Sequence, residues 1–289
     1  MYEKYVKSIP DGNKKKLIAI PLLVAFLTLI LPSILQFMFV AVFPAPANEL
    51  ASFSGMLAMG TTVFVAVFVM SKLAGISYLS LGIKKEKWPF QISIGAICGV
   101  AILSIVAFII LILKAGVLKL NSQFSIIPVL IGLVFFIFQG TWEELIYRAY
   151  LMPHFSKVIG DKWSIMVTSV LFTLGHALNP GMQALPVVNL FIASVVFSLV
   201  YYYTGSLLIV GFGHGLWNFS QGFIFGAEVS GHSISSSVFN TYAQAGKELI
   251  SGGRFGFEGG IITTIVGVVM IIVFIMLIRK ERKERKNEK

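Results

Sequence analysis

The chain has 289 residues, of which 56% are hydrophobic and only 12% are charged. Soluble domains contain about 25% charged residues, so this composition excludes an ordinary soluble domain. The mean hydropathy is +0.86, and several apolar runs exceed the ~18 residues that cross a bilayer as a helix. The sequence also lacks the alternating strands of ~10 residues that outer-membrane barrels need. We therefore expect an all-α, polytopic membrane protein.

The net charge of +10 at neutral pH is typical of membrane topology rather than of nucleic-acid binding. The basic residues lie at the termini and in short loops, and the tail "RKERKERKNEK" directly follows an apolar segment. Lys and Arg beside membrane spans set the orientation of a chain and bind anionic lipid. Cys98 is the only cysteine, which excludes an internal disulfide and a cysteine metal cluster.

In chain order, eight apolar segments are predicted to span the membrane, at about 17–43, 52–74, 90–113, 125–152, 163–178, 186–204, 206–226 and 260–278. With the amino terminus in the cytosol, the outer loops contain few Lys or Arg residues, as the positive-inside rule requires. We therefore expect one integral membrane domain over 1–289, with both termini cytosolic. The Ser- and Gly-rich segment 227–259 is predicted to be an irregular and mobile outer loop.

The fourth predicted span carries three charged residues, in the motif "EELIYR". Charges within a membrane span are costly and mark functional sites. Glu144 and Arg148 are four residues apart, so they share a helix face and are predicted to pair. Glu143 points elsewhere on the helix and has no nearby cation in the sequence. It is therefore a candidate for chemistry.

Two later spans carry further polar side chains. The motif "FTLGH" contains Phe172 and His176, and "HGLWN" places His214 and Asn218 on one helix face. A rise of about 1.5 Å per residue puts these groups at a depth similar to that of Glu143. Polar groups in hydrocarbon are driven towards one another or towards a hydrated cavity. The remaining histidines, His154 and His232, are assigned to loops or interfaces.

Together these side chains indicate hydrolysis of an amide bond. Glu143 and His176 would activate a water molecule as general base, and His214 and Asn218 would stabilise the oxyanion. The alternative is a zinc site, in which Glu143, His176 and His214 bind the metal and water is the fourth ligand. Asn218 is a poor zinc ligand but a natural amide donor, which favours the arrangement without a cofactor.

In their order, "EELIYR", "FTLGH" and "HGLWN" resemble the motifs of the CPBP (CAAX protease and bacteriocin-processing, or Abi) family of intramembrane peptidases. The resemblance covers about 125–225 and implies an eight-helix peptidase with this segment as its catalytic core. It implies catalytic roles for Glu143, His176, His214 and Asn218, supported by Glu144, Arg148 and Phe172. It also implies a cavity open towards the cytosol.

The resemblance further implies a membrane-associated peptide or protein as substrate and a bacterial plasma membrane as location. Two other functions stay open. Some members of the family are linked to bacteriocin immunity and act without proteolysis, as scaffolds. Buried Glu, Arg and His also occur in the ion relays of transporters, although the absence of an internal repeat disfavours that class.

Overall fold

The computed structural model describes residues 2–44, 51–84, 86–234 and 236–287. The elements in chain order are α1 (Glu3–Ser8), α2 (Lys14–Val40), α3 (Phe53–Ala74), η1 (Tyr78–Leu81), α4 (Trp88–Ile112), β1 (Gly116–Leu120), α5 (Ile126–Glu144), η2 (Leu145–Leu151), α6 (Met152–Ile159), α7 (Asp161–Gly175), α8 (Ala184–Thr204), α9 (Leu207–Phe219), η3 (Ser220–Ile224), β2 (Phe239–Ala243), α10 (Glu248–Ser251), η4 (Gly253–Phe255), η5 (Phe257–Gly259) and α11 (Ile261–Asn287). The prediction of an all-α polytopic membrane protein is confirmed.

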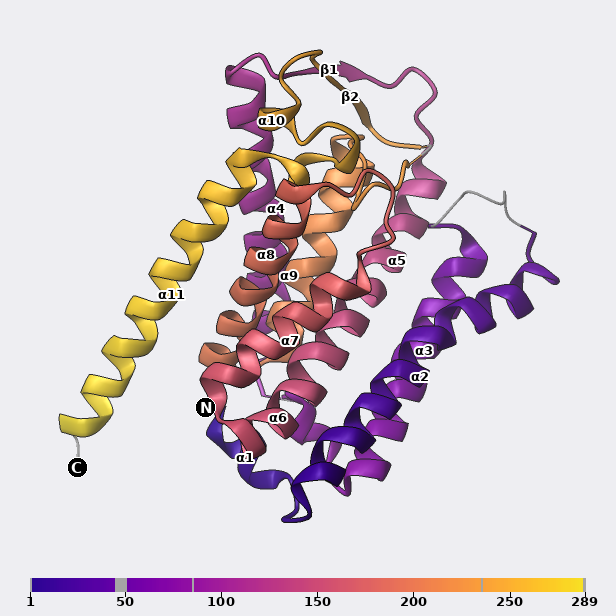
Figure 1. Cartoon of the computed structure of the whole chain (residues 1–289). Coiled ribbons are helices and arrows are strands. Elements are labelled where there is room, and N and C mark those ends of the chain that lie inside the picture. Colours follow the sequence, from indigo (N-terminus) through magenta and orange to yellow (C-terminus); the bar gives the residue numbers. More distant parts are fainter. Residues whose placement is uncertain (1, 45–50, 85, 235, 288–289) are drawn as a thin grey trace.

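In the part of the chain that the structure describes, six helical runs are long and apolar enough to cross a membrane, namely α2, α3, α4, the run Ile126–Ile159, α8 and α11. Helices α7 and α9 have 15 and 13 residues, which is short for a full span. The count of eight spans therefore stays a prediction. Both ends of the chain lie at the same end of the bundle (Figure 1). The side of the membrane on which they lie also stays a prediction.

Helix α9 lies at the centre of the bundle, between α4 and α5, and glycines make its close packing feasible. A Cβ atom on Gly99 of α4 would overlap the carbonyl oxygen of Gly213, and one on Gly215 of α9 would overlap that of Phe136 in α5. Small residues let membrane helices approach closely. The small-residue spacing in "GFGHG" thus holds His214 and Asn218 tightly against the two neighbouring helices.

The helix that carries the acidic pair is longer and less regular than predicted. It runs from Ile126 to Ile159 without a break, so the predicted end near residue 152 is wrong by about two turns. Within it, η2 is a π-helix that begins directly after Glu144. His154, predicted to be a loop or interface residue, is buried in α6, where its Nδ1 atom lies 2.6 Å from the carbonyl oxygen of Tyr150.

The segment 227–259 is not simply irregular. Its strand β2 pairs antiparallel with β1 from the α4–α5 connection, with Gly116 opposite Ala243 and Leu120 opposite Phe239. The short helices α10, η4 and η5 follow β2. Together they form a folded cap at the end of the bundle opposite the termini (Figure 1). We call the segment 227–259 the cap.

Candidate active site

A cavity of about 710 Å³ lies between helices α4, α5, α8, α9 and α11 and reaches the cap. Most of its wall is apolar. Among the described residues that line it, the charged side chains are Glu143 and Glu258, with the three histidines His176, His214 and His232, and none is Lys or Arg. Polar chemistry is therefore confined to one part of a mainly hydrophobic space.

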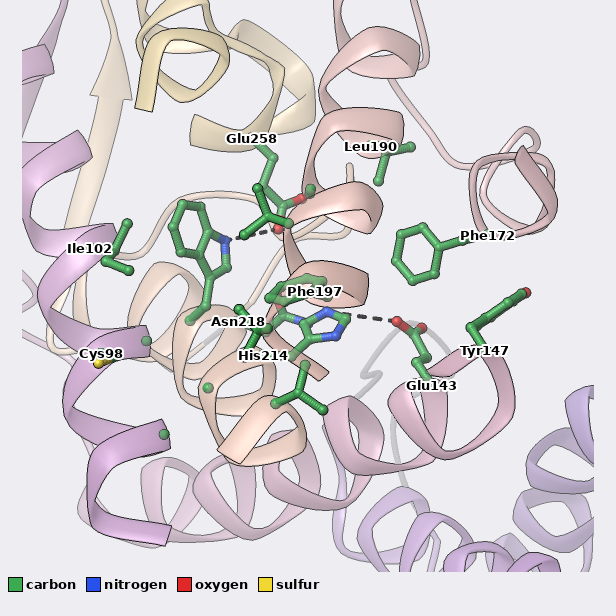
Figure 2. A pocket seen from close by; sticks show the side chains of 18 of the residues that line it. Cys98, Ile102, Glu143, Tyr147, Phe172, Leu190, Phe197, His214, Asn218 and Glu258 are labelled. Atoms are coloured by element: carbon green, nitrogen blue, oxygen red, sulfur yellow. Dashed lines mark hydrogen bonds and ion pairs between the residues drawn. The ribbon is translucent and has the colours of Figure 1, made fainter. Parts of the chain in front are cut away.

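Glu143 faces the imidazoles of His176 and His214 at the wall of this cavity, and Figure 2 shows it pointing towards His214. Its Oε1 atom lies 3.7 Å from Nε2 of His176, and its Oε2 atom lies 3.6 Å from Nε2 of His214. Glu143 is 6% exposed, and Oε2 has no hydrogen-bond partner in the described structure. The three side chains that the sequence analysis selected from separate helices thus converge, as a common hydrated site requires.

The other ring nitrogens fix how the two imidazoles are protonated. Nδ1 of His176 lies 2.8 Å from the carbonyl oxygen of Phe172, and a carbonyl oxygen only accepts, so this Nδ1 carries the hydrogen. Nδ1 of His214 lies 2.8 Å from Oε1 of Glu144 and donates in the same way. Each Nε2 atom therefore directs a lone pair towards Glu143 when its ring is neutral.

Glu144 and Arg148 are fully buried and form an ion pair of 2.9 Å, as their spacing predicted. The guanidinium also donates to the backbone oxygen and the hydroxyl of Ser194 in α8, at 3.0 and 2.6 Å. Because Glu144 also accepts from His214, it does more than neutralise Arg148. It connects the first motif to the third.

Asn218 is connected to Glu143 through Gln139, a residue that was not predicted from the sequence. Its Nδ2 atom donates to Oε1 of Gln139 at 3.0 Å, and Nε2 of Gln139 donates to Glu143 at 2.7 Å. Asn218 is 4% exposed, and its Oδ1 atom has no partner in the described structure. Gln139 precedes Glu143 by four residues, so the two side chains share a helix face. This spacing in the sequence could have indicated their contact.

Two aromatic rings enclose the imidazoles. The Phe172 ring lies 4.5 Å from the His176 ring and 4.6 Å from the Arg148 guanidinium carbon. The Phe197 ring stacks on His214 at 4.6 Å and 19°. Phe172 was expected from its motif, whereas Phe197 of α8 was not. These rings fix the orientation of the polar groups and keep bulk water away from them.

Two of the helices that carry site residues, α5 and α9, change from α to π geometry beside them. In the first, η2 begins directly after Glu144, and in the second, η3 begins at Ser220, two residues after Asn218. A π-helical turn contains an extra residue, which shifts the following side chains around the helix, and such turns are frequent at functional sites. Here they reorient the helix faces next to the polar cluster.

The cap contributes residues that sequence reasoning missed. Oε2 of Glu258 accepts hydrogen bonds from the backbone N–H and the hydroxyl of Ser230, at 3.1 and 2.8 Å, and its Oε1 accepts one from Nε1 of Trp217 at 3.3 Å. Burial raises the pKa of the Glu258 carboxyl. His232, assigned to a loop, also lines the cavity, and burial lowers its pKa.

No three His, Cys, Asp or Glu side chains within the described parts of the chain are grouped as a metal site would require. The alternative of a zinc ion bound by Glu143, His176 and His214 stays a prediction. The chemistry below is derived for what the side chains themselves do.

Comparison with known proteins identifies the segment that carries these residues. A search of curated proteins finds no match. The family model described as type II CAAX prenyl endopeptidase Rce1-like matches residues 125–220, a range that holds all three motifs. This match confirms the resemblance inferred from the motifs. Residues 125–220 of this multi-pass membrane protein thus match the model of the Rce1-like family, whose description names type II CAAX prenyl endopeptidases.

Proposed function

We propose that this protein is an intramembrane endopeptidase that hydrolyses a peptide bond in a membrane-associated protein or peptide. The observation that carries the proposal is the position of the Glu143 carboxylate, 3.6 to 3.7 Å from two Nε2 atoms at the wall of a largely apolar cavity. The Glu143 carboxylate and the neutral Nε2 of His176 accept hydrogen bonds at one place, which His214 faces as an imidazolium donor. A water molecule there would donate to both acceptors and present its oxygen to a substrate.

In the first step Glu143 takes a proton from this water, and the oxygen attacks the carbonyl carbon of the scissile bond. His176 holds the water, because its Nδ1–H is already bound to Phe172 and its Nε2 accepts. General-base catalysis of this kind contributes about 10² to 10⁴-fold in rate. The negative charge then moves to the former carbonyl oxygen.

Donors near that oxygen stabilise the tetrahedral intermediate. His214 donates from Nε2 only as an imidazolium, and the Glu144 carboxylate at 2.8 Å from its Nδ1 stabilises that cation. Asn218 has a second N–H beyond the one bound to Gln139. Loss of one oxyanion donor typically lowers kcat by about 10² to 10³-fold. Glu143 then returns its proton to the leaving nitrogen, the C–N bond breaks, and a carboxylate and an amine are released.

The proposal places the chain in a bacterial plasma membrane with both termini in the cytosol and no cofactor. The basic carboxyl-terminal end of α11 fits this orientation by the positive-inside rule. The site would then open towards the cytosolic half of the bilayer, with the cap on the outer side. No nucleic acid is involved.

The decisive experiment compares Glu143→Gln with the wild type in lipid nanodiscs, using a library of membrane-partitioning peptides and mass spectrometry. We expect at least about a 10³-fold loss of turnover, while Glu248→Gln, an exposed carboxylate of the cap, retains full activity. A chelator should leave the wild type active. Near-normal turnover by Glu143→Gln would refute the mechanism. A variant that lacks turnover but keeps the cellular phenotype would favour the immunity or scaffold alternative.

A further inference from the structure

The cavity has two carboxylates on its wall, and the proposed mechanism uses only one of them. Glu143 projects from α5 beside His214, whereas Glu258 projects from the cap and lies above His214 in the view of Figure 2. None of the described residues that line the cavity is Lys or Arg. A ligand in this space therefore meets two acidic groups and no basic side chain to balance them.

Glu258 is held in place but is not saturated. A carboxylate offers about four acceptor sites, and Glu258 receives three hydrogen bonds, two on Oε2 from Ser230 and one on Oε1 from Trp217. Trp217 belongs to α9, so the carboxylate is fixed both to the cap and to the helix of His214. One acceptor site on Oε1 is left for a donor in the cavity.

Other acceptors in the same cavity also lack donors. Oε2 of Glu143 and Oδ1 of Asn218 belong to side chains that are 6% and 4% exposed, and both atoms are without a partner in the described structure. Buried acceptors without a partner are costly. The water of the reaction would satisfy the first. The general excess of acceptors favours a ligand that carries hydrogen-bond donors and positive charge.

His214 and Trp217, the residue that donates a hydrogen bond to Glu258, lie one turn apart on α9. Trp217 follows His214 by three positions, which is about 4.5 Å along a helix. One residue of extended chain spans about 3.3 to 3.6 Å. A substrate whose scissile bond lies at His214 thus brings a neighbouring side chain to Glu258.

We propose that Glu258 is a specificity-determining residue that binds the side chain of a Lys or Arg next to the scissile bond. This inference rests on the proposed endopeptidase function and narrows its substrates to cationic peptides. The charge-assisted hydrogen bond would form in an apolar, partly enclosed space, where such bonds are strong. A substrate with an acidic group at the same position would be rejected by the carboxylate.

A purely structural role for Glu258 makes a different prediction. If the carboxylate only ties the cap to α9, its replacement lowers turnover equally for every substrate. If it binds a cation, its replacement changes the ratio between substrates. The test therefore measures the ratio of kcat/KM between two substrates rather than the turnover of one substrate.

The experiment uses the full-length protein in nanodiscs and a positional library of apolar peptides, each with one Lys, norleucine, Gln or Glu. Norleucine matches the Lys chain without its ammonium group. We expect wild-type kcat/KM to be at least about tenfold higher for Lys than for norleucine at one position adjacent to the cleaved bond. Glu258→Gln should reduce this ratio to about one, and Glu248→Gln should preserve it.

A wild-type ratio near one would overturn the inference, as would a Glu258→Gln protein that loses turnover evenly and keeps its Lys preference. A wild type that cleaves no peptide would instead contradict the proposed function. In that case, binding of the labelled Lys and norleucine peptides to Glu143→Gln, with and without Glu258→Gln, decides the inference. A Lys preference that disappears with Glu258→Gln supports it, and equal Kd values overturn it.

Discussion

The Nδ1 atom of His214 and the Oε1 atom of Glu144 lie 2.8 Å apart, and that oxygen also pairs with Arg148 at 2.9 Å. One buried carboxylate thus serves a guanidinium on its own helix and an imidazole on α9. The second glutamate of the acidic pair therefore orients the His214 imidazole as well as compensating a charge. Stability and turnover should respond differently when it is removed.

We expect Glu144→Gln to destabilise the protein by about 3 to 5 kcal/mol, because Arg148 is left as an uncompensated buried charge. The double variant Glu144→Leu/Arg148→Met should recover most of this stability, since an apolar pair of similar volume replaces a buried ion pair at little cost. It should not recover turnover, because His214 has lost its acceptor. Thermal unfolding and kcat, measured on the same samples, check this. Wild-type turnover by the double variant would show that His214 does not need Glu144.

The second prediction concerns Gln139, which links Asn218 to Glu143 through two hydrogen bonds. We expect Gln139→Leu to lower kcat by about 10²-fold with little change in KM, since the side chain orients reacting groups without binding substrate. Asn218→Ala should have a similar effect. The double variant should lose scarcely more than either single variant, because both act through one chain of hydrogen bonds. Additive losses would mean that the two residues act independently.

Much of the fold and the main site residues could be predicted because charge is so rare in this sequence. In a chain with 12% charged residues, a pair such as Glu144 and Arg148 stands out, and helical spacing gives their contact directly. The convergence of Glu143, His176 and His214 followed from similar depth and the cost of isolated polar groups. Apolar segments likewise marked the long helices.

The features that were missed depend on tertiary structure. The π-helices after Glu144 and near Asn218 arise from packing between helices and have no local composition that marks them. Strand β2 of the cap pairs with β1, which lies far from it in the chain. The regular structure of the cap therefore could not be inferred from its Ser and Gly content. Glu258 enters the cavity only because the cap folds over it.

The third prediction concerns the packing of α9 and compares two glycines on it. A Cβ on Gly215 would overlap the backbone of α5, whereas one on Gly213 has its nearest contact at 3.4 Å, with the Gly95 oxygen. Alanine at 215 should therefore destabilise the protein by about 1 to 3 kcal/mol. Alanine at 213 should be neutral or stabilising, by up to about 1 kcal/mol, since it removes freedom from the unfolded chain. Thermal unfolding checks both. A more harmful change at 213 would contradict this account of the packing.

The last prediction uses the pH dependence of stability. Burial raises the pKa of the Glu258 carboxyl, while the hydrogen bonds from Ser230 and the charges of His214 and His176 oppose the rise. The folded state therefore holds this proton more tightly than the unfolded state, and the free energy of unfolding falls as pH rises through the folded pKa. Glu258→Gln cannot ionise, so its stability relative to the wild type should be greater at about pH 8 than at about pH 5.

Glu248 provides a control of opposite sign in the same cap. Backbone N–H groups, its own and that of Gly246, lower the pKa of its carboxyl, so its ionised form stabilises the folded state above the unfolded pKa. Glu248→Gln should therefore lose stability relative to the wild type as pH rises. Midpoints of thermal unfolding for the three proteins at both pH values test the pair of predictions. If the stability of Glu258→Gln relative to the wild type were instead greater at the lower pH, the folded state would favour the ionised carboxylate. That result would contradict the effect of burial described above.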